Sequence, residues 1–309
     1  MTQISIVTPT FNEEQNIEIL CSEIKREMNK LNIEYEHIVI DNSSTDKTIP
    51  ILKEICLKDK NLKVIINSKN YGHIRSPFYG LLQSSGDASI LMASDFQDPV
   101  ELIPKYIEKW KKGCKIVLGE KNTSEESNIK FSLRKLFYNF LNKISDFKLT
   151  KNTTGSGIFD KSVIEKLKKI NDPYPYFRGL IAELGEEIET IKFNQPLRKY
   201  GKTKNNISTL YDIGILGIVK HSRKPLRFMI LLGFVLSVIS FFVGIFYFIY
   251  KLLFWESFNL GMAPLIIGIF IFSSIQITLL GLLGEYIGVF LLHQRYIPLV
   301  QEKERIHFD

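Results

Sequence analysis

Short apolar runs alternate with longer segments of helical period through the first part of the chain. Each short run predicts a buried strand, and each longer segment, with apolar residues three or four positions apart, predicts a helix. We expect strands at 4–8, 37–40, 62–66, 88–92 and 115–118, and helices at 13–31 (capped by Asn12), 46–57, 74–85 and from Pro99 onward. Such alternation is typical of an α/β domain with a mainly parallel, doubly wound sheet.

The last third of the chain contains two long segments without a charged residue, 228–250 and 257–284. A transmembrane helix needs about 20 apolar residues, so each segment is long enough to cross a bilayer. A buried helix of a soluble core is the alternative, but such helices rarely reach this length without a charge. No apolar segment precedes Thr10, so we expect no cleavable signal peptide. The pattern predicts a membrane protein with a large N-terminal domain outside the bilayer.

Basic residues flank the two apolar segments on one side of the predicted membrane. They are Lys220, Arg223, Lys224 and Arg227 before the first segment, and Arg295, Lys303 and Arg305 after the second. The connecting loop has only Lys251, offset by Glu256. The positive-inside rule therefore predicts a multi-pass protein of the inner (plasma) membrane with both termini in the cytoplasm. The apolar stretch 207–219 is either a helix lying in the inner interface or the last helix of the soluble domain.

Composition adds two limits to this picture. The 309 residues include 40 Lys and Arg against 33 Asp and Glu, a net charge of +7, and 45% hydrophobic residues, which excludes wholesale disorder. The three cysteines, Cys21, Cys56 and Cys114, are far apart and odd in number. They exclude a disulfide framework and a cysteine-based zinc cluster.

Polar and acidic residues follow four of the predicted strands. In a parallel sheet, ligands bind at the loops beyond the carboxyl ends of the strands, here 8–13, 41–46, 69–75 and 93–98. No glycine-rich phosphate loop follows the first strand, which excludes the dinucleotide-binding and P-loop fingerprints. Asp and Asn are common in ordinary turns. At Asp41 and Asp95 together we favour a function, since their oxygens suit a hydrated divalent cation and a nucleotide.

The order of motifs at these loops resembles glycosyltransferase family 2, with a GT-A fold. The matching segments are TPTFNEEQNI (8–17), IDNSSTDKT (40–48), NYGHIRSP (70–77), ASDFQDPVELI (93–103), YFRGLIAELG (176–185) and QPLRKYGKTK (195–204). The branch it resembles contains dolichyl-phosphate mannose synthase and undecaprenyl-phosphate glycosyltransferases. This resemblance implies an inverting enzyme that moves a sugar from a UDP- or GDP-sugar to a polyprenyl phosphate, with Mg²⁺ or Mn²⁺.

The resemblance also implies roles for individual residues. The nucleotide would be bound by Pro9, Thr10, Asn12, Glu13, Asp41 and Asn70. Asp95 and Gln97 would face the metal-bound diphosphate, and Asp95, Arg198 and Lys204 are the catalytic candidates. The candidates for the acceptor phosphate are Lys121, Arg178, Arg198 and Lys204, with Asp160 and Glu183 as further polar candidates nearby. The alternative for Arg198 and Lys204 is a solvated basic face near anionic lipid, which we favour less.

Three departures from the family pattern affect the expected chemistry. Ala93 replaces the first Asp of the Asp-x-Asp motif, Asn42 replaces an acidic residue, and Gly155-Ser156-Gly157 replaces an acidic-aromatic-Arg motif. Magnesium tolerates the loss at 93, because water and the diphosphate can complete its coordination. No general base is carried over at 155–157. A phosphate acceptor needs none, since it is largely dianionic near neutral pH.

The expected division of the chain is a GT-A domain (1–206), a juxtamembrane helix and basic cluster (207–227), two transmembrane helices (228–250 and 260–292) joined by an outer loop (251–259), and a cytoplasmic tail (293–309). Glycines in the hairpin permit close helix approach and a homo-oligomer. No nucleic-acid partner is expected. The alternatives are a non-catalytic membrane scaffold derived from such a transferase, and a transferase to another lipid or glycan acceptor.

Overall fold

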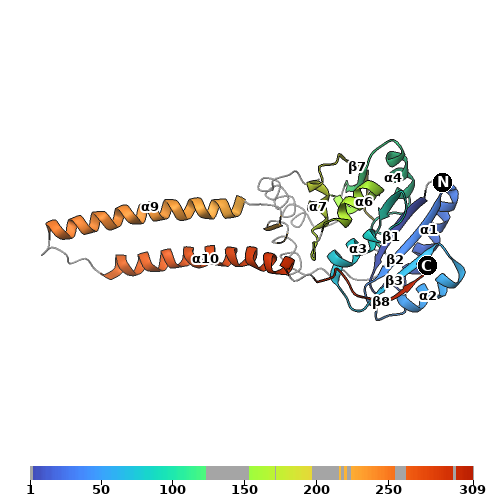
Figure 1. The fold of residues 1–309 in the computed structure, drawn as a ribbon, viewed down its shortest axis with the longest axis horizontal. Coiled ribbons are helices and arrows are strands. Elements are labelled where there is room, and N and C mark those ends of the chain that lie inside the picture. The colour runs from blue at the N-terminus through green and yellow to red at the C-terminus, as the bar shows by residue number, and fades with distance from the viewer. Residues whose placement is uncertain are drawn as a thin grey trace.

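A computed structural model gives the structure of the chain and describes residues 3–122, 153–170, 172–196, 216, 219–220, 224–254, 262–294 and 297–308. The described residues form an α/β domain built on one mixed sheet, from which two long helices extend in one direction (Figure 1). The predicted strand and helix alternation is confirmed through residue 121, with element ends shifted by a few residues.

The sheet has eight strands among the described residues, in the order β7-β5-β6-β4-β1-β2-β3-β8. Their bounds are β1 Gln3–Thr10, β2 Glu34–Asp41, β3 Leu62–Asn67, β4 Ala88–Leu91, β5 Ile116–Lys121, β6 Thr153–Asp160, β7 Ile188–Phe193 and β8 Glu302–Ile306. β1 pairs in parallel with β2 and β4, as do β2 with β3 and β5 with β7. β6 runs antiparallel between β4 and β5, and β8 antiparallel to β3. The carboxyl ends of β1 to β5 therefore lie at one edge.

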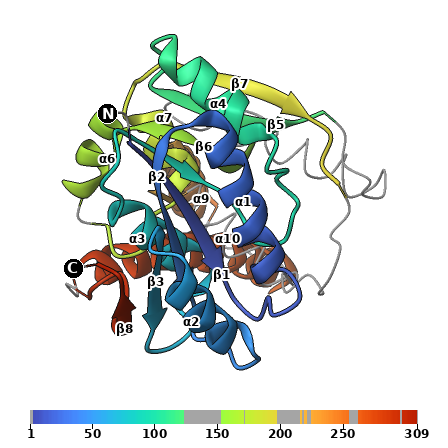
Figure 2. The ribbon, with the colours of Figure 1, turned by 90° about the vertical axis from the view of Figure 1, so that its right-hand side faces the viewer.

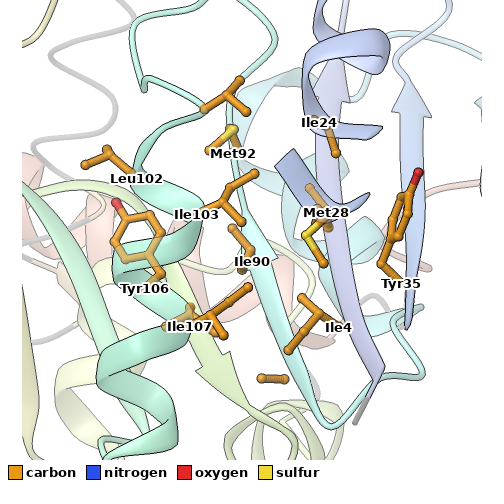
Figure 3. Close-up of a cluster of buried hydrophobic side chains, with 14 of the residues drawn as sticks. Ile4, Ile24, Met28, Tyr35, Ile90, Met92, Leu102, Ile103, Tyr106 and Ile107 are labelled. Atoms are coloured by element: carbon orange, nitrogen blue, oxygen red, sulfur yellow. The ribbon is translucent and has the colours of Figure 1, made fainter. Parts of the chain in front are cut away.

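Helices cover both faces of the sheet. The short helices are α1 Ile17–Leu31, α2 Thr48–Lys58, α3 Gly72–Leu82, α4 Leu102–Lys111, α6 Lys161–Lys168 and α7 Phe177–Glu183. α1, α2 and α4 pack on one face and α3, α6 and α7 on the other (Figure 2). In Figure 3, Ile24 and Met28 of α1 converge with Tyr106 of α4 on Ile4 and Ile90 of the sheet. This burial of apolar area is the main stabilising term of the domain.

The two long helices are α9 Lys224–Leu253 and α10 Met262–Gln294 (Figure 1). Large apolar side chains along them are exposed, for example Ile230 (73%) and Phe242 (63%) on α9 and Ile277 (69%) on α10. By length and composition, Ile271–Leu291 is long and apolar enough to span a membrane, and none of it is buried. It is the single such stretch found among the described residues, so a crossing by α9 stays a prediction.

The chain returns to the sheet after α10. The region expected as a tail (293–309) contains β8, which pairs with β3 from Val64↔Ile306 to Asn67↔Glu302. The sequence analysis did not predict this strand. The expected interfacial helix at 207–219 lies outside the described residues except for Leu216 and Val219, which are helical and buried. Both ends of the α9–α10 hairpin therefore adjoin the same domain.

Candidate active site

The loops after β1 and β2 are held together at the carboxyl edge of the sheet. Asn12 has a left-handed backbone (φ 55°), and its side-chain oxygen accepts a hydrogen bond from the Thr45 backbone N–H at 2.8 Å. The Asn12 backbone N–H in turn donates to the Ser44 hydroxyl at 2.8 Å. The prediction that Asn12 caps the first helix is wrong, because α1 begins only at Ile17 and Asn12 is used between the two loops. Its role is to fix the spacing of the β1 and β2 ends.

Asp41 ends β2 opposite Thr10 of β1 and is fully buried. Its two carboxylate oxygens accept from the backbone N–H and the hydroxyl of Ser44, at 2.8 and 2.5 Å. Burial raises the pKa of the Asp41 carboxyl, and the Ser44 hydrogen bonds oppose that rise. The Thr10 hydroxyl is also buried and has no hydrogen-bond partner among the described residues. Glu13 nearby accepts from the Asn16 amide at 2.6 Å. Asp41 thus has a turn role and lies beside a hydroxyl with spare hydrogen-bonding capacity.

Asn42 connects the end of β2 to the loop between β3 and α3. Its amide nitrogen donates to Asn70 Oδ1 at 2.8 Å and to the Gly72 carbonyl at 3.2 Å. Its amide oxygen accepts from Asn67 Nδ2 at 3.2 Å and from the Tyr71 backbone N–H at 2.8 Å. A carboxylate could not donate the first two bonds. The departure at Asn42 therefore has a structural reason, and it fixes Asn70, a predicted nucleotide-binding residue.

Asp95 lies in the loop after β4 and is 7% exposed. Its carboxylate accepts from the Gln97 backbone N–H at 3.2 Å across Phe96, which is buried and left-handed (φ 59°). The preceding Ser94 hydroxyl donates to the Pro9 carbonyl at 3.1 Å, which joins this loop to that of β1. The predicted nucleotide and diphosphate loops are thus connected to one another at the sheet edge.

Asp95 is the predicted carboxylate ligand for a divalent ion at this edge. Within the described ranges, no group of three or more His, Cys, Asp or Glu side chains is arranged to hold a metal. Mg²⁺ sites often use one or two carboxylates and take their other ligands from water and substrate phosphates. Asp95 fits such a shared site, in which the donor diphosphate supplies part of the coordination.

The glycine segment on β6 brings an arginine to the same edge. Gly155 has a left-handed backbone (φ +88°), and a Cβ there would lie 3.8 Å from Nε of Arg178. Gly157 has no room for a side chain, because a Cβ would lie 2.2 Å from the Val117 carbonyl oxygen of β5. Between them, the Ser156 hydroxyl donates to Asp98 in the loop after β4. Arg178 is therefore close to the strand segment where the family arginine is missing.

The position of Arg178 depends on the first residue of helix α7, Phe177. Phe177 packs edge-on against Phe78 of α3 and Phe159 of β6, with ring centroids 6.0 and 5.3 Å apart. Such aromatic pairs add about 0.5–1.5 kcal/mol beyond area burial. Phe177 anchors the helix in the core, and the next residue, Arg178, lies toward β6.

The other predicted site residues are distributed unevenly. Lys121 ends β5 at the carboxyl edge, and Glu183 lies at the end of α7. Arg198 and Lys204 lie outside the described residues. Asp160 pairs with Ala88 at the far end of β4 and caps α6 by accepting from the Ser162 backbone N–H at 2.9 Å. Its proposed place near the acceptor is wrong, because it belongs to the opposite edge of the sheet from Asp95.

Comparison with known proteins agrees with this fold and order of motifs. A model of glycosyl transferase family 2 matches residues 5–168. The bactoprenol glucosyl transferase of Shigella phage SfV is 29% identical over 96% of this chain and 96% of its own length. The prophage bactoprenol glucosyl transferase homolog of Escherichia coli K12 is 30% identical over 93% of this chain and 94% of its own. An uncharacterized glycosyltransferase of Bacillus subtilis, YkcC, is 31% identical over 93% and 88%.

A solved structure is similar in fold. Glucosyl-3-phosphoglycerate synthase from Mycobacterium tuberculosis, in complex with Mn²⁺, UDP and phosphoglyceric acid, has a TM-score of 0.50 and 20% sequence identity. The match covers 71% of this chain and 76% of that one.

Proposed function

The chain belongs to glycosyl transferase family 2, and on that premise we propose that it transfers a sugar from a nucleotide sugar to a polyprenyl phosphate at the cytoplasmic face of a membrane. The observation that carries this proposal is the length of the similarity. Relatives named bactoprenol glucosyl transferase match over more than nine tenths of the chain, including the α9–α10 hairpin as well as the sheet domain. Bactoprenol is a polyprenyl lipid, and glucose is the first sugar to test.

The donor nucleotide is assigned to the edge between β1, β2 and β3. Asp41 and the spare Thr10 hydroxyl lie opposite one another there, and Asn70 is held beside them by Asn42. Hydroxyl, carboxylate and amide groups are suited to the base edge and ribose of a nucleotide. The Ser94–Pro9 hydrogen bond joins the loop of Asp95 to the β1 end of this edge, so Asp95 lies in the loop next to the proposed nucleoside site.

The diphosphate is assigned to the Asp95 side of the same edge. Asp95 and Gln97 would hold a divalent ion together with the donor; when bound, that ion supplies positive charge to the departing nucleoside diphosphate. Arg178 and Lys121 add cationic side chains near this edge, and a guanidinium can bind a phosphate through two parallel hydrogen bonds. Electrostatic stabilisation of the leaving group is the main demand on the protein.

The transfer requires no general base on the protein. A phosphate oxygen of the acceptor attacks the anomeric carbon, and the bond from that carbon to the diphosphate oxygen breaks with its electron pair, which inverts the anomeric centre. The acceptor is already anionic near neutral pH, so no proton has to be removed. Gly155 in place of an acidic residue is compatible with this chemistry.

The hairpin is proposed to bring the domain to its lipid substrate. Exposed Phe, Ile and Leu side chains run along both α9 and α10, and such surfaces are rare on proteins that face only water. α10 leads back into β8 of the sheet, so a two-helix membrane hairpin would have both ends on the domain side. Lys224 and Arg227, exposed at the start of α9, suit the cytoplasmic surface.

A product assay tests the proposal directly. Purified full-length protein in detergent is incubated with undecaprenyl phosphate, Mg²⁺ and a panel of UDP- and GDP-sugars, and the lipid is examined by mass spectrometry. We expect a new hexosyl-phosphoryl lipid, and the donor that yields it identifies the sugar. The Asp95→Ala protein should form no such product. Donor hydrolysis without a lipid product would indicate another acceptor. Neither donor binding nor product would indicate a non-catalytic scaffold.

A further inference from the structure

The chain segment that leaves the hairpin is bound to the loop that leads into α3. Arg75, in the first turn of α3, donates from Nε to the Leu299 carbonyl at 2.7 Å and from a terminal nitrogen to the Pro298 carbonyl at 2.6 Å. The Ser68 backbone N–H donates to the Gln301 carbonyl at 2.9 Å. We call residues 68–75 the α3 entry segment and residues 297–301 the post-hairpin segment. The Arg75 guanidinium and the Ser68 backbone N–H thus join the two segments, one from each end of the α3 entry segment.

The Arg75 guanidinium is also fixed from within its own segment. It lies 5.0 Å from the centroid of the Tyr71 ring, and the Tyr71 hydroxyl is 3.1 Å from the Ser68 hydroxyl. A cation over an aromatic face contributes about 0.5–1 kcal/mol at an exposed site. Hydrogen bonds from a charged donor to two carbonyls are stronger than neutral ones. Arg75 is therefore the group that organises the contact with the post-hairpin segment.

The α3 entry segment is bound on its other side to the strand end that ends in Asp41. Asn42, the next residue after Asp41, bonds to the Tyr71 backbone N–H, to Asn70 Oδ1 and to the Gly72 carbonyl. An unbroken set of hydrogen bonds and packing contacts thus runs from the end of the membrane hairpin, through Arg75 and the α3 entry segment, to the neighbour of Asp41.

We propose that Arg75 is a positioning residue that holds the α3 entry segment in its nucleotide-binding conformation by docking it on the post-hairpin segment. The donor site is then complete only when the chain beyond α10 is seated on the sheet. This proposal rests on the proposed function, in which Asp41 and Asn70 contact the donor nucleotide. It makes the end of the hairpin part of the donor site.

The simpler reading is that these contacts only anchor β8. The structure separates the two readings, because β8 has other attachments that do not touch the α3 entry segment. Lys53 pairs with Glu304 at 2.6 Å, and the Tyr79 hydroxyl donates to Glu302 at 2.9 Å. The ladder to β3 uses no Arg75 side-chain bond, so we expect it to remain when Arg75 is replaced. Lys53→Met therefore provides a matched control that removes one attachment of β8 without touching the α3 entry segment.

The test measures nucleotide binding in the full-length, detergent-solubilised protein. UDP and GDP are each titrated calorimetrically with Mg²⁺ into wild type, Arg75→Met, Arg75→Lys and Lys53→Met, and the donor KM, lipid KM and kcat are measured in parallel. We expect Arg75→Met to weaken nucleotide binding and raise the donor KM about tenfold, equivalent to about 1.4 kcal/mol. The lipid KM and kcat should stay within about twofold of wild type, and Lys53→Met should bind as wild type does. Arg75→Lys should recover part of the loss, because an ammonium supplies a cation without the fixed fork.

Two results would overturn the proposal while leaving the proposed function intact. One is wild-type nucleotide affinity in both Arg75 variants. The other is an equal loss of affinity in Arg75→Met and Lys53→Met, which would assign the effect to β8 as a whole. Wild-type protein that binds neither nucleotide would overturn the proposed donor site itself, and this inference with it.

Discussion

Lys220 donates to both carboxylate oxygens of Asp172, at 2.5 and 2.7 Å, and the two side chains are only 6% and 7% exposed. The same ammonium also donates to the Tyr174 carbonyl at 2.6 Å. Sequence analysis counted Lys220 among the basic residues that precede the first apolar segment, and the structure shows that its charge is buried in this pair. The contact joins the chain just before α9 to the segment that leads into α7, the helix of Arg178.

Breaking this pair is expected to destabilise the domain strongly. Asp172→Asn leaves a buried ammonium without its counter-charge, and such single removals cost about 3–5 kcal/mol. Lys58→Met is the matched control, since its pair with Glu54 is exposed on both sides (73% and 69%) and should change the free energy of unfolding by less than about 0.5 kcal/mol. Thermal unfolding of the full chain in detergent measures both. Equal effects of the two variants would contradict the buried pair.

Stability is expected to fall in mild acid because of His37. This β2 side chain is buried, lies 3.0 Å from the Thr8 hydroxyl of β1, and has its pKa lowered by burial to about 4, while the negative charge of Asp59 acts in the opposite direction. The unfolded imidazole titrates near 6.5, so the unfolded state binds the proton first. This contribution to stability is complete above about pH 6.5 and is lost as the pH falls toward 4.

His37→Gln tests that linkage. In wild type, the free energy of unfolding should be lower at pH 4 than at pH 7, and His37 should account for up to about 3 kcal/mol of that difference. In the variant the difference should be smaller by this amount, whatever its stability at pH 7. Chemical denaturation at several pH values measures the slope. An unchanged slope in His37→Gln would assign the acid sensitivity to other groups.

Nucleotide binding is expected to depend on a divalent ion through Asp95. Mg²⁺ should strengthen UDP binding to wild-type protein by about tenfold, or about 1.4 kcal/mol, because the ion would be shared between the carboxylate and the diphosphate. Asp95→Asn keeps the shape of the side chain and should reduce this gain to below about twofold. Asp87→Asn, on an exposed residue before β4, should keep the full gain. Titration with and without EDTA is the measurement, and a full gain in Asp95→Asn would remove Asp95 from the metal site.

The local pattern of apolar and polar residues was enough to predict the strands and loops at the carboxyl edge of the sheet, but not the added strand β8. The strands expected at 4–8 and 37–40 end at Thr10 and Asp41, within two residues of the predicted ends, and the loop of Asp95 follows the strand expected at 88–92. β8 could not be predicted in this way, because Glu302–Ile306 has four consecutive charged residues before its one apolar residue, Ile306, and lies far along the chain from its partner β3. Its pairing is accompanied by tertiary contacts to distant elements, such as Tyr79 with Glu302 and Lys53 with Glu304.

Side-chain roles in the candidate site were harder to predict than its location. Asn42 departs from the family pattern, and only its four hydrogen bonds reveal that an amide is required there. The lost family arginine at 157 could not be related to Arg178 from sequence, because Arg178 approaches the same strand segment, at Gly155, only when α7 packs on β6. Spacing along the chain carries no information about such contacts between distant elements.

The central claim is transfer to a phosphate without a general base, and one comparison tests it most directly. Full-length protein with its preferred nucleotide sugar is given undecaprenyl phosphate or undecaprenol at equal concentration, and initial rates of lipid glycosylation are compared. We predict product from the phosphate and none from the alcohol, because no base is carried over on β6 to accept the hydroxyl proton. Comparable rates on the two lipids would contradict this account.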